Sequence, residues 1–173
     1  ISDGSELAHN SDELAVAAAE LWERQPNLKQ IVIKLNEGFS GEGNALMDLS
    51  PLENVAPGNA SHRERVATIC DHFPYMRFQC STEIWDHFHC RIHELGAIAE
   101  AFVDGGNKRS PSVQGRITPF GEVEILSTHD QVLGGLDSQI FLGCVFPADQ
   151  VYRLQLQEMG RKVGRSLAQK GAL

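Results

Sequence analysis

Apolar and polar residues alternate with two different periods along the chain, and these periods predict a mixture of helices and strands. Apolar residues recur at helical spacing in four stretches: 10–24, 61–73, 82–95 and 148–170. Short apolar or alternating runs favour strands in six others: 31–36, 44–49, 97–103, 112–118, 122–127 and 139–146. The order of these segments predicts an α+β protein.

Glycine, proline and small polar residues separate the predicted elements. Residues 50–59 are expected to form a loop, 119–121 to join two strands as a hairpin, and 127–131 with Gly134 and Gly135 to form a polar turn. Asp104-Gly-Gly-Asn107 is the strongest turn signal in the middle of the chain. We therefore expect a first part at 1–103 and a second part at 104–173.

The run Ile31-Val-Ile-Lys-Leu-Asn36 places a lysine at a fixed height on a predicted strand. With the two-residue period of a strand, Ile31, Ile33 and Leu35 lie on one face, and Lys34 lies on the other. Three glycines follow within residues 38–43, where they allow main-chain N–H groups to approach an anion. The segment is predicted to be a strand–turn–strand hairpin with an ammonium group beside a phosphate-sized nest; an ordinary polar hairpin is the alternative.

Two common phosphate motifs are excluded by order and spacing. A Walker loop has its lysine after the glycines, whereas Lys34 precedes them. A dinucleotide fingerprint reads G-x-G-x-x-G, whereas this loop reads G-x-x-G-x-G. The hairpin therefore belongs to a different class of phosphate site.

Composition narrows the classes of partner. The 173 residues are 42% hydrophobic and 22% charged, with a net charge of -8, which suits a folded protein and disfavours nucleic acid or an anionic membrane as partner. No apolar run approaches the roughly 20 residues of a membrane span, and a cytoplasmic location is expected. Four cysteines without a C-x-x-C pair favour free thiols. The start at Ile1, without methionine, and the stop at Leu173 suggest a piece of a longer protein.

Three ordered blocks give the chain a family resemblance: KLNEGFSGEGNA, SPSVQGRITPFGEVEILSTHDQVLGG and FLGCVFPAD. Together they resemble the ATP-grasp superfamily, in particular its carboxylate–amine ligase branch, which includes peptide ligases. The resemblance implies a partial ATP-grasp fold: two α+β lobes with antiparallel sheets and flanking helices, with ATP held between them.

The resemblance also implies roles for individual residues. Lys34 and the glycine-rich loop would hold the phosphates, and Glu100 would accept bonds from the nucleoside while the backbone of residues 101–103 pairs with adenine. The implied cofactor-binding residues are Lys34, Gly38, Ser40, Gly41, Gly43, Asn44, Glu100, Phe102 and Val103. Lys34 and Arg116 are the candidate catalytic residues. A solvated glutamate at position 100 and an ion-paired surface arginine at position 116 are the alternatives.

Two histidine-containing segments invite other readings. His89 and His93, with Asp86, have a spacing that a zinc site uses, but further ligands are not evident, and an exposed polar helix face is preferred. His129 and Asp130 are adjacent, which does not by itself bring their side chains together as an acid–base pair.

The reaction implied by the resemblance is ATP-dependent ligation. A carboxylate would attack the γ-phosphate and release ADP, and an amine would displace phosphate from the resulting acyl phosphate, with magnesium bridging the phosphates. Magnesium ligands are expected beyond Leu173, in the remainder of the parent chain, so residues 1–173 alone are expected to bind ATP weakly and not to turn over. A non-catalytic nucleotide-binding regulatory module and a small-molecule kinase are the alternatives.

Overall fold

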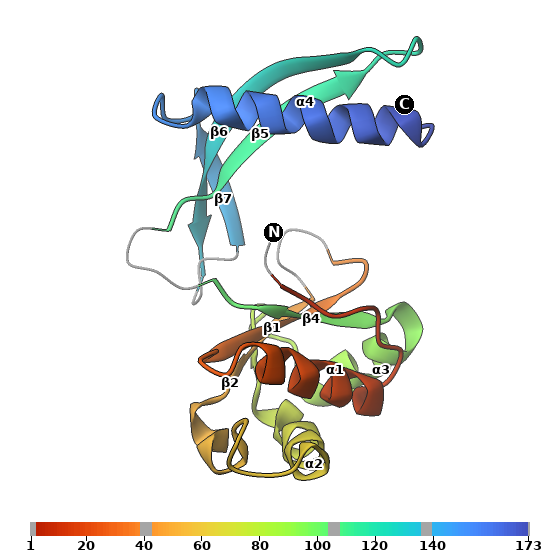
Figure 1. The fold of residues 1–173 in the computed structure, drawn as a ribbon, viewed down its shortest axis with the longest axis vertical. Helices are drawn as coiled ribbons and strands as arrows, with labels where there is room; N and C mark the ends of the chain where they lie inside the picture. The colour runs from red at the N-terminus through yellow and green to blue at the C-terminus, as the bar shows by residue number, and fades with distance from the viewer. Residues whose placement is uncertain (1–2, 39–42, 104–107, 136–139, 173) are drawn as a thin grey trace. The chain divides into compact units, whose positions relative to one another are not determined.

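The computed structural model describes residues 3–38, 43–103, 108–135 and 140–172. By its internal contacts the chain divides into two compact units, residues 1–104 with 135–140, and residues 105–134 with 141–173. Each unit combines helices with a sheet (Figure 1), as the α+β prediction requires. No helix within the described ranges is both long and apolar enough to span a membrane.

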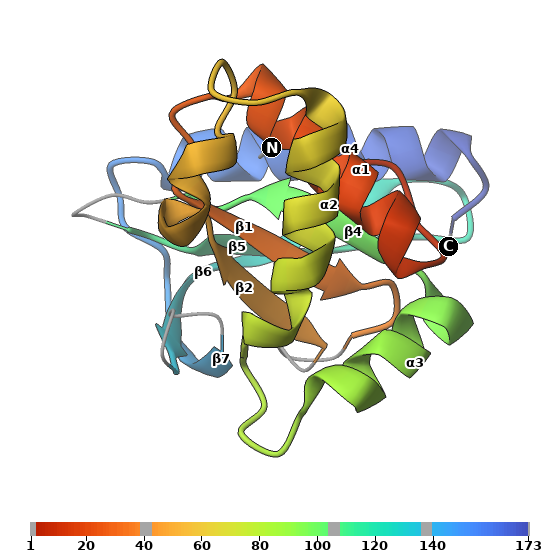
Figure 2. The same ribbon diagram turned by 90° about the horizontal axis from the view of Figure 1, so that it is seen from below.

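The first unit contains a four-stranded antiparallel sheet in the order β3-β2-β1-β4. Its elements are α1 (Ser11–Arg24), β1 (Gln30–Leu35), β2 (Asn44–Asp48), the 3-10 helix η1 (Ser50–Val55), α2 (His62–His72), η2 (Phe73–Tyr75), β3 (Arg77–Phe78), α3 (Trp85–Leu95) and β4 (Ala97–Ala101). Helices α1 and α2 lie together on one side of this sheet, as Figures 1 and 2 show from two directions.

The helix starts follow local capping chemistry. The side chain of Asn10 accepts a hydrogen bond from the Glu13 backbone N–H, which otherwise lacks a partner in the first turn of α1. Ser61 and Glu64 form a reciprocal capping box at the start of α2, which begins within the stretch 61–73 predicted to be helical. These caps place both helices where their apolar stripes face the sheet.

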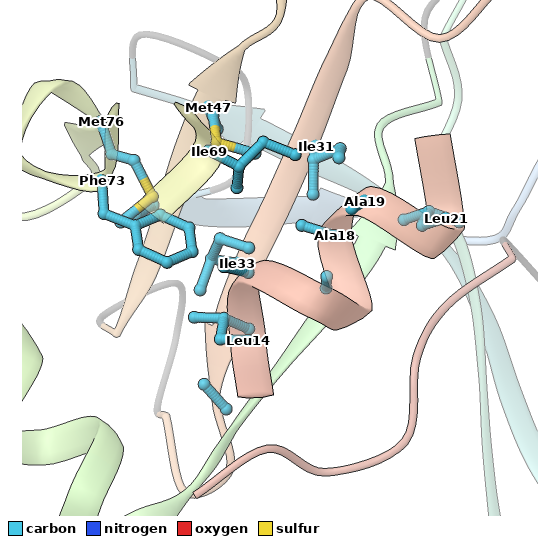
Figure 3. Packing of buried hydrophobic residues seen from close by; sticks show 14 of the residues in the cluster. Leu14, Ala18, Ala19, Leu21, Ile31, Ile33, Met47, Ile69, Phe73 and Met76 are labelled. Carbon is cyan, nitrogen blue, oxygen red and sulfur yellow. The ribbon is translucent and has the colours of Figure 1, made fainter. Parts of the chain in front are cut away.

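The core of the first unit lies between the sheet and its helices. Leu14 and Ala18 of α1 approach Ile31 and Ile33 of β1, and Met47 of β2 lies beside them (Figure 3). The predicted alternation holds, because Ile31 and Ile33 are fully buried whereas Lys34 is only half-buried. Lys34 therefore lies on the face of the sheet opposite the core helices.

A buried arginine joins three segments of the first unit. Arg65 of α2 is 2% exposed. Its guanidinium donates to the carbonyls of Val55, Ala56 and Ala60 at 2.8, 3.2 and 3.0 Å and pairs with Glu23 of α1. Arg65 thus supplies donors to three carbonyls of this turn, of which the Ala56 carbonyl also accepts from the Asn59 N–H at 2.8 Å.

Residues 3–8 run along the outer edge of β4, an arrangement that the sequence pattern did not predict. The Ser5 N–H donates to the Ala99 carbonyl at 2.8 Å, and the Ser5 hydroxyl accepts from the Ala99 N–H at 2.9 Å. Gly4 forms an antiparallel bridge with Glu100. Asp3 pairs with Arg24 at 3.3 Å, which ties the segment to the end of α1. We call residues 3–8 the N-terminal strap.

The second unit is a three-stranded sheet, in the order β5-β6-β7, packed against one helix. Its elements are β5 (Pro111–Ile117), β6 (Val123–Gly134), β7 (Ile140–Val145) and α4 (Arg153–Gln169). The helix α4 lies across β5 and β6 (Figure 1). No residue of α4 is fully buried, and an open groove of about 680 Å³ runs beside it, floored by Val123 and Ile125.

Two glycines seat α4 on the β5–β6 hairpin. A Cβ atom on Gly160 would lie 2.9 Å from Val113 Cγ1, and one on Gly164 would lie 2.5 Å from Val123 Cγ1. In the sequence these glycines only weaken a helix. In the structure they let the helix backbone approach the sheet.

The substitution Gly164→Ala is therefore expected to destabilise the second unit, although alanine is intrinsically the better helix former by about 1 kcal/mol. The new methyl group would overlap the stiff side chain of Val123, at a cost of about 1–3 kcal/mol. Amide hydrogen exchange across α4 should become faster. Ser166→Ala, an exposed position of the same helix, should leave exchange unchanged or slow it. Slower exchange in Gly164→Ala would contradict the close packing.

Several predicted boundaries were wrong, each for a local reason. Residues 127–131 form no turn but continue β6, because Ser127, Thr128 and His129 pair with residues of β5. Within the predicted loop 50–59, a 3-10 helix forms with Pro51 in its first turn. Three further boundaries differ by two or more residues from the prediction: α3 begins at residue 85, not 82; α4 begins at 153, not 148; and β4 ends at 101, not 103. Ile84, inside the range 82–95 expected to be helical, is instead the extended N-cap of α3, and it is 51% exposed.

Candidate functional site

The β1–β2 hairpin presents the predicted loop at one end of the first sheet. Leu35 donates its N–H to the Gly43 carbonyl at 2.9 Å, which closes the hairpin. Gly43 has φ +86°, and a Cβ there would lie 3.3 Å from Leu35 Cβ, so the position favours glycine. Gly38 is exposed at the other side of the loop. The predicted phosphate-binding residues Ser40 and Gly41 lie outside the described residues.

Lys34 and Glu100 come together on the face of the sheet opposite the core helices. Glu100 pairs in register with Val32, two residues before Lys34, so the two side chains are diagonal neighbours across β1 and β4. Lys34 Nζ donates to Glu100 Oε2 at 2.6 Å. Asn44 is the direct cross-strand partner of Lys34 on β2. Thus three of the predicted residues, from three strands, share one patch.

The ion pair leaves hydrogen-bonding capacity for a ligand. The side chains of Lys34 and Glu100 are 37% and 24% exposed. An ammonium group has three donors and a carboxylate has two acceptor oxygens, so a single bond between them uses only part of each. Lys34 therefore keeps donors, and Glu100 keeps acceptor capacity, beyond the bond between them.

The backbone after β4 is partly engaged in the sheet. The Phe102 N–H donates to the Gln30 carbonyl at 3.2 Å, and the Ala101 N–H donates to the Asp3 carbonyl of the N-terminal strap at 2.8 Å. Val103 follows the strand and is 68% exposed. The Ala101 and Phe102 N–H groups are therefore bonded within the first unit.

Arg116 belongs to the second unit. Its Nε donates to Glu124 Oε2 at 2.7 Å across the β5–β6 pair, and its side chain is 64% exposed. The structure therefore contains the surface ion pair that the sequence left open as an alternative for this residue.

Asp130 forms a side-chain cluster that the sequence did not indicate. It accepts from the Tyr152 hydroxyl and, at 2.8 Å, from the Asp149 N–H. The hydrogen bond to Asp130 raises the pKa of Tyr152, and the Val151 N–H together with Arg109, at 2.6 Å, lowers the pKa of Asp149. The cluster fixes the start of α4 to β6 and accounts for the late beginning of that helix.

In both histidine-containing segments the histidine rings pack against other rings. His129 lies 5.4 Å, ring to ring, from Phe146, whereas Asp130 bonds to Tyr152, so the two do not form an acid–base pair. His89 and His93 pack edge to face at 4.9 Å. Within the described ranges no three His, Cys, Asp or Glu side chains gather as a metal site would require. This result does not test the magnesium ligands, which were expected elsewhere and stay a prediction.

Comparison with known proteins identifies the family to which the chain belongs. A family model described as "IQCH-like, ATP-grasp" matches residues 60–173. The L-propargylglycine–L-glutamate ligase of Streptantibioticus cattleyicolor is 36% identical over 86 residues, which cover 50% of this chain and 17% of that enzyme. No solved structure matches the chain. Because the family model covers more than half of the residues, and the α+β architecture is that of a partial ATP-grasp fold, the chain belongs to the IQCH-like ATP-grasp family.

Proposed function

We propose that this chain is the ATP-binding portion of an ATP-dependent carboxylate–amine ligase that acts through an acyl phosphate. The observation that carries the proposal is the Lys34–Glu100 pair at 2.6 Å, which joins the residue assigned to phosphate with the residue assigned to the nucleoside. In ATP the phosphate chain begins at the ribose, and here the two residues are adjacent on one sheet face. The similarity to a ligase supports the type of reaction.

In the proposed reaction each residue of the site would have one role. Lys34 would offset the charge that builds up on the phosphates while a carboxylate attacks the γ-phosphate. Asn44 and the hairpin loop would position the phosphates, and Glu100 would orient the ribose. Magnesium, when bound, would supply further neutralisation of the phosphate charge. The carboxylate and amine substrates, and the ligands of the metal, would be met by the remainder of the parent chain.

Calorimetric titration with ATP and magnesium tests the binding half of the proposal. ATP should bind more tightly than adenosine or tripolyphosphate, because only ATP engages both members of the Lys34–Glu100 pair. Equal binding of ATP and tripolyphosphate would contradict the role of Glu100, and no binding of ATP would contradict the proposal as a whole.

Product analysis on a longer protein that contains this chain tests the ligation half. ADP release that requires both a carboxylate and an amine is the expected result. ADP release with a single acceptor would indicate a small-molecule kinase instead. Nucleotide binding without release under any combination of acceptors would indicate a regulatory module.

A further inference from the structure

In the N-terminal strap, Gly4 lies close to the side chain of Glu100. Gly4 lies opposite Glu100 in an antiparallel bridge. A Cβ on Gly4 would lie 3.2 Å from Glu100 Cγ and 3.3 Å from the Ala99 carbonyl oxygen. Cross-strand neighbours share a face of the sheet, so the stem of Glu100 occupies space that a side chain at position 4 would take.

The strap is fastened on both sides of this contact. Toward the N-terminus, Asp3 accepts from the Ala101 N–H through its carbonyl and binds Arg24 and Gln25 through its carboxylate. Arg24 also donates to the Gly4 carbonyl at 3.1 Å. On the other side, Ser5 makes two bonds to Ala99. Gly4 is therefore not free to move aside when a larger residue is introduced.

These contacts assign a role to a segment that the family match, at residues 60–173, does not cover. We propose that Gly4 is a positioning residue: by leaving room for the Glu100 stem, it holds the Glu100 carboxylate against Lys34 and sets the nucleoside end of the site. The inference rests on the proposed function for its consequence in binding. The effect on the ion pair itself does not require any ligand.

The test compares Gly4→Val and the milder Gly4→Ala with Glu6→Ala, a control in the same strap. Valine suits an extended backbone, so the strap can still pair with β4 while the Glu100 stem is displaced. In the unliganded chain, the NMR signals of the Lys34 ammonium and the Glu100 carboxyl should shift in both Gly4 variants and not in Glu6→Ala. Unchanged signals in both Gly4 variants would overturn the inference, whatever the chain binds.

The binding consequence is measured with adenosine and tripolyphosphate separately. Gly4→Val should weaken adenosine binding on the order of tenfold, because a displaced carboxylate no longer meets the sugar. It should leave tripolyphosphate binding within about twofold. In a Glu100→Ala background the Gly4 substitution should have no further effect on adenosine.

The outcomes distinguish the positioning role of Gly4 from the proposed function of the chain. An equal adenosine loss with and without Glu100 would mean that the strap acts only through general stability, and would overturn the positioning role. If the ion-pair signals shift in both Gly4 variants while the wild-type chain binds no nucleotide, the positioning of Glu100 is supported and the proposed function alone is contradicted.

Discussion

Replacing Lys34 by alanine is expected to weaken ATP binding by about 10–100-fold. Lys34 is the cation that the first sheet places beside the glycine hairpin, and a charge-assisted hydrogen bond to phosphate contributes roughly 1.5–3 kcal/mol. The substitution also leaves Glu100 without its 2.6 Å partner, so an uncompensated carboxylate would then face the phosphates. Titration with ATP and with adenosine measures the effect, and ATP should lose more affinity than adenosine.

Lys29→Ala is the matched control. Lys29 precedes β1 in the same unit and is exposed. Its removal changes the net charge by the same amount as Lys34→Ala, so a loss of affinity from overall charge would affect both variants equally. ATP affinity that is lower by the same factor in both would contradict a specific role for Lys34, as would an unchanged affinity in Lys34→Ala.

Replacing Arg65 by alanine is expected to lower the free energy of unfolding of the first unit by about 3 kcal/mol. The Val55 and Ala60 carbonyls would lose the guanidinium as a donor, the Ala56 carbonyl would keep only the Asn59 N–H, and Glu23 would lose its buried partner, and each unmet group is costly. Trp22 and Trp85 both lie in the first unit, so denaturant unfolding followed by tryptophan fluorescence reports on that unit.

Arg63→Ala provides the comparison, because Arg63 is exposed on the same helix one position after His62. Its removal should change the unfolding free energy by less than about 0.5 kcal/mol. Arg65→Lys should recover only part of the loss, since an ammonium group cannot reproduce the fork that reaches several carbonyls at once. Full recovery with lysine would show that charge, and not hydrogen-bond geometry, is what Arg65 supplies.

The sequence predicted best where a single local signal decides the structure. The helices expected at 10–24 and 61–73 begin after the caps Asn10 and Ser61, α3 ends before Gly96, and Lys34 lies on the face opposite Ile31 and Ile33. It predicted least where the decisive partner is distant. The N-terminal strap depends on pairing with β4, about ninety positions away, and no periodicity in six residues reveals that.

The same distinction applies to the candidate site. The strand position of Lys34 follows from its neighbours, but the contact with Glu100 depends on β4 pairing with β1 in one register. Arg65 resembles a surface arginine in sequence, because helical spacing does not show that a turn will fold around it. Asp130 is adjacent to His129 in sequence, but successive residues of a strand point to opposite faces. The partner of Asp130 is the distant residue Tyr152.

The two glycines of α4 also restrict how the second unit can rearrange. A helix that slides along its axis moves most readily by one turn, about 5.4 Å, since this brings equivalent positions four residues apart into register. A slide in one direction would place Leu156 where Gly160 now meets Val113, and a slide in the other would place Ala168 where Gly164 now meets Val123. Either step puts a side chain into space that only glycine fits. The helix is therefore locked in a single register, and any motion of this unit must carry α4 and the β5–β6 hairpin together.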